Sequence, residues 1–67
     1  MNNNDNDVIS VHCTDTEVSA DGIILDWRGD KVRVNLNGII LFFKKHKGTL
    51  YVARTAGLEF TINMEGQ

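Results

Sequence analysis

Apolar and polar residues alternate strictly in two segments of the chain. Residues 31–36 place Val32, Val34 and Leu36 on one side and three polar residues on the other, and residues 58–63 repeat the pattern. A period of two is typical of a β-strand with one buried face. The six glycines recur every seven to ten residues. Such regular turn signals between short apolar segments indicate a small all-β meander, sandwich or barrel.

The pattern predicts five strands, at 22–28, 31–36, 39–45, 49–54 and 58–63, and a sixth at the edge of the sheet over 8–13. A capping box at 14–17 could open a single helical turn that ends near Gly22. The polar residues 1–7 are predicted to be a disordered tail, and 8–67 a single domain. The predicted fold class is all-β: a small five- to six-stranded antiparallel meander, an SH3-like barrel, with an OB-like barrel as the alternative.

The turns predict which residues lie opposite one another. Asn37 and Gly38 favour a two-residue type I′ turn, which pairs Leu36 with Ile39 and Val32 with Phe43. Similar turns are predicted at 29–30 and 46–47, and a three-residue loop at 55–57. These turns pair Trp27 with Val32, Leu25 with Val34, Asp26 with Arg33, Phe42 with Tyr51, and Val52 with Phe60. The predicted core is Ile23, Leu25, Trp27, Val32, Val34, Leu36, Ile39, Leu41, Phe43, Leu50, Val52, Leu58, Phe60 and Ile62.

The same registers predict the rows of side chains on the outer face of the sheet. One row is Asp26, Arg33, Phe42 and Tyr51; a second is Arg28, Lys31, Lys44 and Thr49; a third is Ile24, Asn35, Ile40 and Ala53. A solvent-facing sheet normally carries polar residues. Ile40 and Phe42 break that rule, because residues 39–43 are apolar on both sides of the strand. Something is therefore expected to cover this face.

Three kinds of cover are possible. The N-terminal segment could fold back over the patch through Val8, Val11 or Val18. A protein partner or a second copy of the chain could bind it, since exposed apolar patches commonly mark interfaces. Single-stranded nucleic acid could bind it, because aromatic side chains stack bases while neighbouring cations contact phosphates.

Charge is segregated along the chain although the net charge is only −2. Residues 1–30 carry seven acidic residues and one basic residue, whereas residues 31–54 carry six basic residues and none that is acidic. Such segregation creates a local field. The densest run is Lys44, Lys45, His46 and Lys47, which could contact phosphate or simply be a solvated hairpin that discourages edge pairing.

The sequence favours a small non-enzymatic protein-interaction module, regulatory or inhibitory, that self-associates through the outer face. The expected partner-binding residues are Ile24, Arg33, Ile40, Phe42 and Tyr51. The alternative is an RNA- or single-stranded DNA-binding barrel. For that function the candidate residues are Lys31, Arg33, Asn35, Phe42, Lys44, Lys45, Lys47 and Tyr51.

Catalysis has little support in the sequence. His12, Cys13 and His46 are the only candidates for a nucleophile or base, and His12 and Cys13 lie on opposite sides of one strand. Their spacing matches no metal site, and Cys13 is expected to be a small buried hydrophobe. No enzyme activity, cofactor, metal site or small-molecule substrate is therefore predicted.

Targeting signals are also missing from the sequence. The longest apolar run, 39–43, is far too short to cross a membrane. The first residues lack the basic and apolar regions of a signal peptide. We therefore expect a cytoplasmic protein that does not bind membranes.

Overall fold

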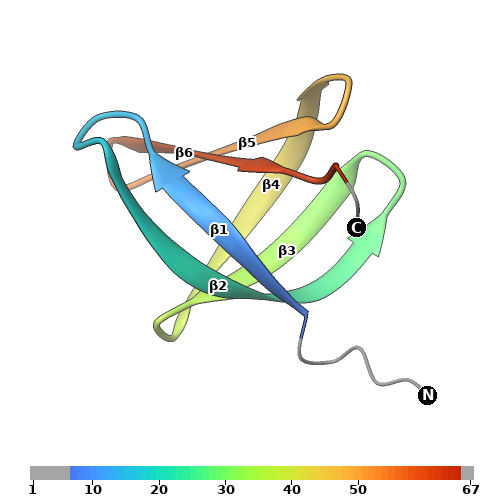
Figure 1. Ribbon diagram of the computed structural model, residues 1–67, viewed down its shortest axis with the longest axis horizontal. Coiled ribbons are helices and arrows are strands. Elements are labelled where there is room, and N and C mark those ends of the chain that lie inside the picture. Colours follow the sequence, from blue (N-terminus) through green and yellow to red (C-terminus); the bar gives the residue numbers. More distant parts are fainter. Residues whose placement is uncertain (1–6, 66–67) are drawn as a thin grey trace.

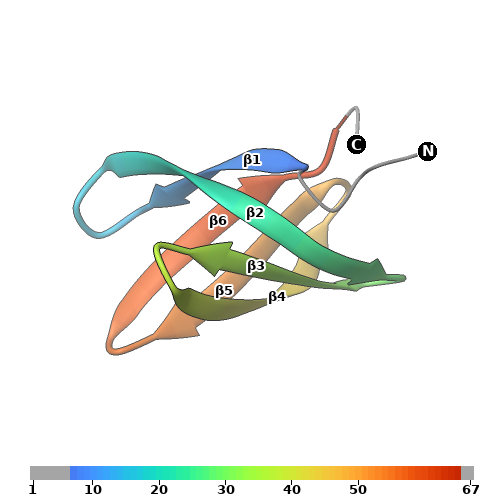
Figure 2. The ribbon, with the colours of Figure 1, turned by 90° about the horizontal axis from the view of Figure 1, so that it is seen from below.

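The computed structural model describes residues 7–65, which form a closed antiparallel barrel of six strands (Figures 1 and 2). Each strand is hydrogen-bonded to the next in the sequence, and the last returns to the first. The strands are β1 (Val8–Cys13), β2 (Val18–Arg28), β3 (Lys31–Leu36), β4 (Ile39–Lys47), β5 (Leu50–Thr55) and β6 (Leu58–Asn63). The prediction of an all-β meander forming a small barrel of the SH3-like or OB-like kind is confirmed. Residues 14–17 form a turn, so the possible helical turn is absent from this segment.

The β3–β4 hairpin has the predicted register. Leu36 lies opposite Ile39, and Val32 lies opposite Phe43. Asn37 and Gly38 form the two-residue turn, with φ of 53° and 89°. Positive φ at both central positions is the requirement of a type I′ turn, and asparagine and glycine meet it at the least cost.

A β-bulge changes the buried side of β2. The register shifts between Ile24 and Asp26, so Ile24, and not Leu25, lies opposite Val34. Ile24 is therefore buried at 8 % exposure, whereas Leu25 is 43 % exposed. The prediction that placed Leu25 in the core and Ile24 outside is wrong, because the bulge inserts one extra residue into the strand. Beyond the bulge, the predicted pair of Asp26 with Arg33 is restored.

The turn between β4 and β5 lies two residues later than predicted. Residues 48–49 form it, with Gly48 at a φ of 58°, and Lys47 lies opposite Leu50. A second register shift follows between Lys45 and Lys47. Together these changes place Tyr51 and Ala53 in the core, each 3 % exposed. The predicted inward positions in β5, Leu50 and Val52, are only partly buried.

The β5–β6 turn is also one residue shorter than predicted. Thr55 lies opposite Leu58, which leaves Ala56 and Gly57 as a two-residue turn. This change pairs Ala53, and not Val52, with Phe60. In β5 the inward and outward faces are exchanged relative to the prediction. The shorter turn exchanges the pairing once more, so the side chains of β6 that were predicted to face inward do so.

β1 is not an edge strand, because it closes the barrel. It pairs with β2 over six residues and with β6 at His12–Thr61 and Cys13–Phe60. Its inward side chains join the core, and Cys13 is buried as expected. Val11 is therefore in the core and does not cover the outer sheet face, while Val8 and Val18 are 52 % and 60 % exposed. In the described residues, the N-terminal segment does not cover the outer patch.

The core is the layer of side chains enclosed by the six strands. Its buried apolar members are Ile9, Val11, Ile24, Val32, Val34, Leu41, Phe43, Tyr51, Ala53, Ile62 and Met64, with Leu36 and Phe60 packed against them. Two further predicted core residues are wrong: Ile39 is 59 % exposed beside a turn, and Trp27 is 44 % exposed. The ends of a short barrel cannot enclose the strand termini, which is why both are exposed.

The predicted tail falls mainly on residues 1–6, which lie outside the described residues. Asp7 is described, and its carbonyl oxygen accepts a 2.8 Å hydrogen bond from the N–H of Ile24. The described residues include no helix that could span a membrane.

Candidate interaction surface

The outer faces of β2, β3 and β4 bring two rows of side chains together. Asp26, Arg33 and Phe42 lie opposite one another across the three strands, and so do Arg28, Lys31 and Lys44. We call these six residues the outer platform. Together with Val32 and Phe43 they line an open hollow of about 650 Å³. Both rows were predicted from the turns at 29–30 and 37–38.

Phe42 is the most exposed large apolar side chain of the described residues, at 69 %. Ile40, two residues away on the same side of β4, is 39 % exposed. Fully burying one such side chain typically stabilises an assembly by about 1.5–3 kcal/mol. The two residues therefore form an exposed apolar centre whose contact with water is unfavourable.

An ion pair lies beside Phe42. The Nη2 and Nε atoms of Arg33 donate to Oδ2 of Asp26 at 2.6 Å and 3.0 Å. The hydrogen bond from Arg33 holds the pKa of the Asp26 carboxyl below its usual range, and Asp26 in turn raises the pKa of Arg33. Arg33 is thus already paired with an anion, and its side chain is oriented by that contact.

The second row of the outer platform carries three cations. Lys31 lies directly opposite Arg28 on one side and Lys44 on the other. Like charges on directly opposite residues destabilise a sheet. The two ion pairs found among the described residues, Arg33–Asp26 and Arg54–Glu59, involve none of these three. This cation row is therefore a concentration of positive charge beside an exposed aromatic ring.

Two predicted surface residues are not on the surface. Tyr51 is buried, and its hydroxyl donates to the carbonyl of Gly29 at 3.0 Å and accepts from Trp27 Nε1 at 3.3 Å. Ile24 is buried by the bulge in β2. Gly48 is the one local sequence signal for the observed turn, because glycine readily adopts the positive φ found there. A turn placed at Gly48 gives β5 the register in which Tyr51 faces inward.

The remaining predicted site residues lie around the platform. Asn35 is opposite Ile40, but its Oδ1 accepts a 2.8 Å hydrogen bond from the N–H of Gly38 and so stabilises the turn. Lys45 and Lys47 are exposed near the end of β4. Lys45 lies opposite the buried Tyr51, on the other side of the strand from Lys44 and Phe42.

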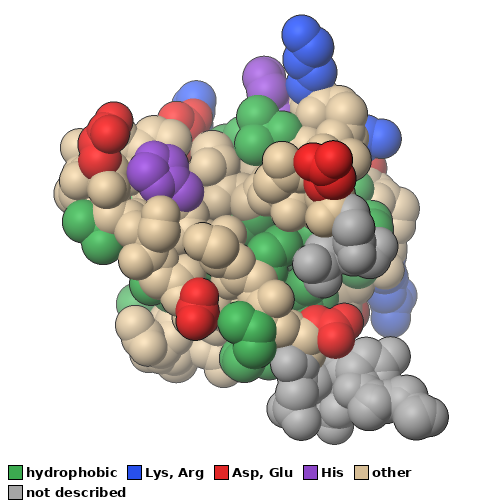
Figure 3. All heavy atoms as spheres, in the orientation of Figure 1, with side chains coloured by type: hydrophobic (Ala, Val, Ile, Leu, Met, Phe, Trp, Pro, Cys, Tyr) green, Lys and Arg blue, Asp and Glu red, His purple; other side chains and the backbone are tan. Residues whose placement is uncertain are grey.

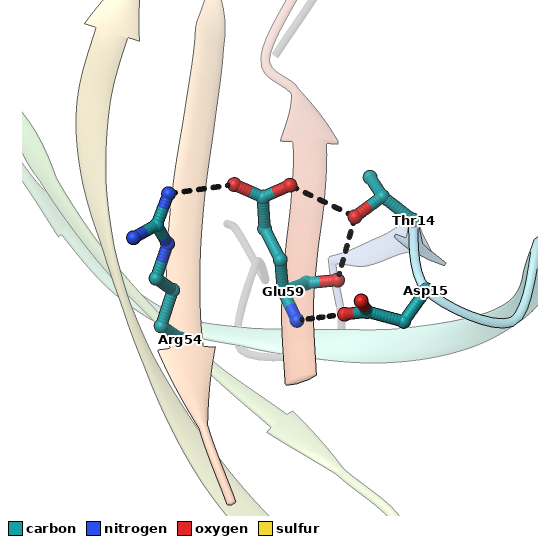
Figure 4. Close-up of polar contacts among 4 residues, drawn as sticks. All are labelled: Thr14, Asp15, Arg54 and Glu59. Carbon is teal, nitrogen blue, oxygen red and sulfur yellow. Dashed lines mark hydrogen bonds and ion pairs between the residues drawn. The ribbon is translucent and has the colours of Figure 1, made fainter. Parts of the chain in front are cut away.

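A separate polar cluster joins the β1–β2 turn to β6 (Figure 4). Glu59 accepts a 2.8 Å hydrogen bond from the Thr14 hydroxyl and a 3.2 Å ion-pair contact from Arg54. The N–H of Glu59 donates to Asp15 Oδ2 at 2.7 Å. The hydrogen bond from the Thr14 hydroxyl, and after it the one from Arg54, lower the pKa of the Glu59 carboxyl. These contacts connect the β1–β2 turn and β5 to β6 beside the place where the barrel closes.

Two of the candidate catalytic residues, His12 and Cys13, are neighbours in β1. His12 Nδ1 and Ser19 Oγ are 3.0 Å apart across the β1–β2 ladder, and Cys13 faces the core. Within residues 7–65, no group of three or more histidine, cysteine, aspartate or glutamate side chains could hold a metal ion.

Comparison with known proteins adds no relative. The chain matches no family model, no curated protein and no solved structure.

Proposed function

We propose that the protein is a non-enzymatic protein-interaction module that self-associates through the outer platform and its neighbour Ile40. The observation that carries this proposal is the exposure of Phe42 and Ile40 on a face that no other described segment covers. β1, the segment that might have covered them, is used to close the barrel. Burial of this apolar centre against a second protein surface supplies the driving force.

Small size supports the same proposal. A domain of about 60 residues buries only about 60 % of the surface that its unfolded chain exposes. With one cysteine in 67 residues, the chain has no internal disulfide to reinforce it. Association is a common way for so small a domain to gain stability.

The proposal predicts that Phe42→Ser weakens self-association. Sedimentation velocity over a wide range of micromolar concentrations should show the wild type becoming heavier than 7.5 kDa. The variant should associate at least about tenfold more weakly, since each 1.4 kcal/mol is a factor of ten. Val8→Ser, which removes an apolar side chain of similar exposure from β1, is the matched control and should associate normally. A wild type that remains monomeric throughout contradicts the proposal.

Single-stranded nucleic acid is the second candidate ligand, because the cation row lies beside Phe42. In that function Phe42 stacks a base while Lys31, Lys44, Lys45 and Lys47 contact phosphates. The burial of Tyr51 removes one of the two expected stacking surfaces. The same proteins should therefore be titrated with labelled single-stranded oligonucleotides at about 50 mM salt, where phosphate contacts are strongest. Absence of binding there discards this candidate.

A further inference from the structure

The β1–β2 turn carries acidic residues, whereas the outer platform carries four basic residues and one acid. The turn that joins β1 to β2 and the turn that joins β2 to β3 lie at opposite ends (Figures 1 and 2). The first bears Asp15 and Glu17, whereas the second contains Asp30 and is flanked by Arg28 and Lys31 of the cation row. Figure 3 shows acidic side chains at the first end and basic side chains along the opposite edge, where acidic side chains also lie.

The acidic end projects from the barrel. β2 pairs with β1 from Val18 to Ile23 and with β3 only from Ile23 onward. Among the described residues, 18–22 therefore have a ladder neighbour on one side only. We call residues 14–21 the projecting arm. It leaves Val18 60 % exposed, although Val18 lies opposite the buried Cys13.

The projecting arm is ordered and its charges are available. The N–H of Glu17 donates to the carbonyl of Cys13 at 2.7 Å, and Asp15 is held through Oδ2 by the N–H of Glu59. Neither of the two ion pairs in the described structure involves Asp15, Glu17 or Asp21. A prearranged acidic arm loses little entropy on binding, which favours association.

We propose that the projecting arm of one copy binds the outer platform of the next, so that the chain associates head to tail. In this arrangement the acidic residues of the arm lie against the cation row. Their negative charge relieves the repulsion among the three cations. A two-fold contact between identical platforms would instead bring two cation rows into one interface. A head-to-tail contact is heterologous, and it builds a ring if it closes or a filament if it does not. This inference rests on the self-association proposed above and names the surface that the platform binds.

Charge exchange between the two surfaces tests the inference. One variant, Lys31→Glu/Lys44→Glu, makes the platform acidic, and the other, Glu17→Lys/Asp21→Lys, makes the arm basic. Each variant alone should associate at least about tenfold more weakly than the wild type, because like charges then meet. An equimolar mixture should associate again, since each surface of one variant meets an oppositely charged surface of the other. Fluorescence of Trp27 checks that each variant is folded.

The outcomes separate this inference from the function on which it rests. If Phe42→Ser abolishes association but the charge variants associate as the wild type does, self-association stands and the head-to-tail arrangement is wrong. If mixing restores nothing, the arrangement is wrong as well. A monomeric wild type overturns both proposals. Raising the salt from about 50 mM to about 500 mM should weaken wild-type association, because the Debye length falls several-fold over that range.

Discussion

Among the glycines of the described residues, Gly22 is the one at which an added Cβ atom would meet other atoms. A Cβ atom added there would lie 2.6 Å from Val34 Cγ1 and 3.1 Å from Val11 Cγ2. The regular spacing of the glycines predicts a turn at this position. Gly22 instead lies inside β2, where the strand passes from its β1 partner to its β3 partner. Close approach of neighbouring side chains, and not a turn, explains the glycine.

Gly22→Ala is accordingly expected to destabilise the fold by about 1–3 kcal/mol, the usual cost of overpacking a core. The measurement is urea unfolding followed by the fluorescence of Trp27, the only tryptophan. Gly48→Asn is the control, since no atom lies within 4 Å of a Cβ there and asparagine tolerates the positive φ of 58°. Equal unfolding midpoints for Gly22→Ala and the wild type would contradict this explanation, because they would show that the neighbouring valines accommodate the added methyl group without cost.

At the scale of elements, the turns decide which face of each strand is buried. The Asn37–Gly38 turn suits its positive φ angles, and the register of β3 with β4 follows the prediction. The β5–β6 turn is less suited, because Ala56 has a φ of 52° ahead of Gly57. A residue with a Cβ atom is strained in this conformation, and asparagine relieves part of the strain by bonding locally.

Replacing Ala56 by asparagine should therefore stabilise the protein, by about 0.5–1 kcal/mol. Ala56 is exposed, so the change should not disturb the core. Ala56→Val provides the opposite test, because a β-branched side chain at positive φ should destabilise the turn. Urea midpoints that fall in the order asparagine, alanine, valine support the explanation, and any other order contradicts it.

At the scale of the whole molecule, closure of the barrel depends on few contacts between β1 and β6. The ladder between them has two residue pairs, compared with six between β1 and β2. The cluster of Thr14, Asp15, Arg54 and Glu59 lies next to this short ladder and adds side-chain contacts to it (Figure 4). Residues more than 40 positions apart in the chain thus hold the barrel closed.

This closure should be sensitive to acid. The Glu59 carboxyl has a lowered pKa in the folded state, so its ionised form stabilises the fold at pH above the ordinary carboxyl range. That contribution is lost as the pH falls through the lowered folded-state pKa. Arg33 also lowers the pKa of the Asp26 carboxyl, so the stabilising contribution of ionised Asp26 is likewise lost in acid. The stability of the wild type should therefore decline below about pH 4–5, where glutamate and aspartate ordinarily titrate.

Glu59→Gln tests how much of this acid sensitivity comes from the cluster around Glu59. Near pH 7 the variant should be less stable than the wild type, and the difference should shrink in acid, where Glu59 itself becomes neutral. Glu65→Gln, an exposed acid outside both the cluster and the projecting arm, is the control and should show no such convergence. Urea midpoints measured across the acid range provide the comparison. A difference that stays constant with pH would mean that the Glu59 charge has no part in closure.

Much of the platform could be predicted from the sequence because its rows depend on local turns. Arg33 lies opposite Phe42, and Lys31 opposite Lys44, once the Asn37–Gly38 turn is recognised. The pairing of Asp26 with Arg33 follows in the same way from the turn at 29–30. Residues close in sequence fold against each other with few alternatives, so turn chemistry and alternation suffice.

The sequence by itself determined an all-β meander, the β3–β4 hairpin, and the segregation of acidic and basic segments along the chain. Only the tertiary structure decided that Ile24 and Tyr51 face inward and that β1 closes against β6. These features depend on two register shifts and on pairing between distant strands. A strand that bends to complete a barrel takes up extra residues in bulges. No local pattern specifies where they fall, because the whole closed sheet determines that position.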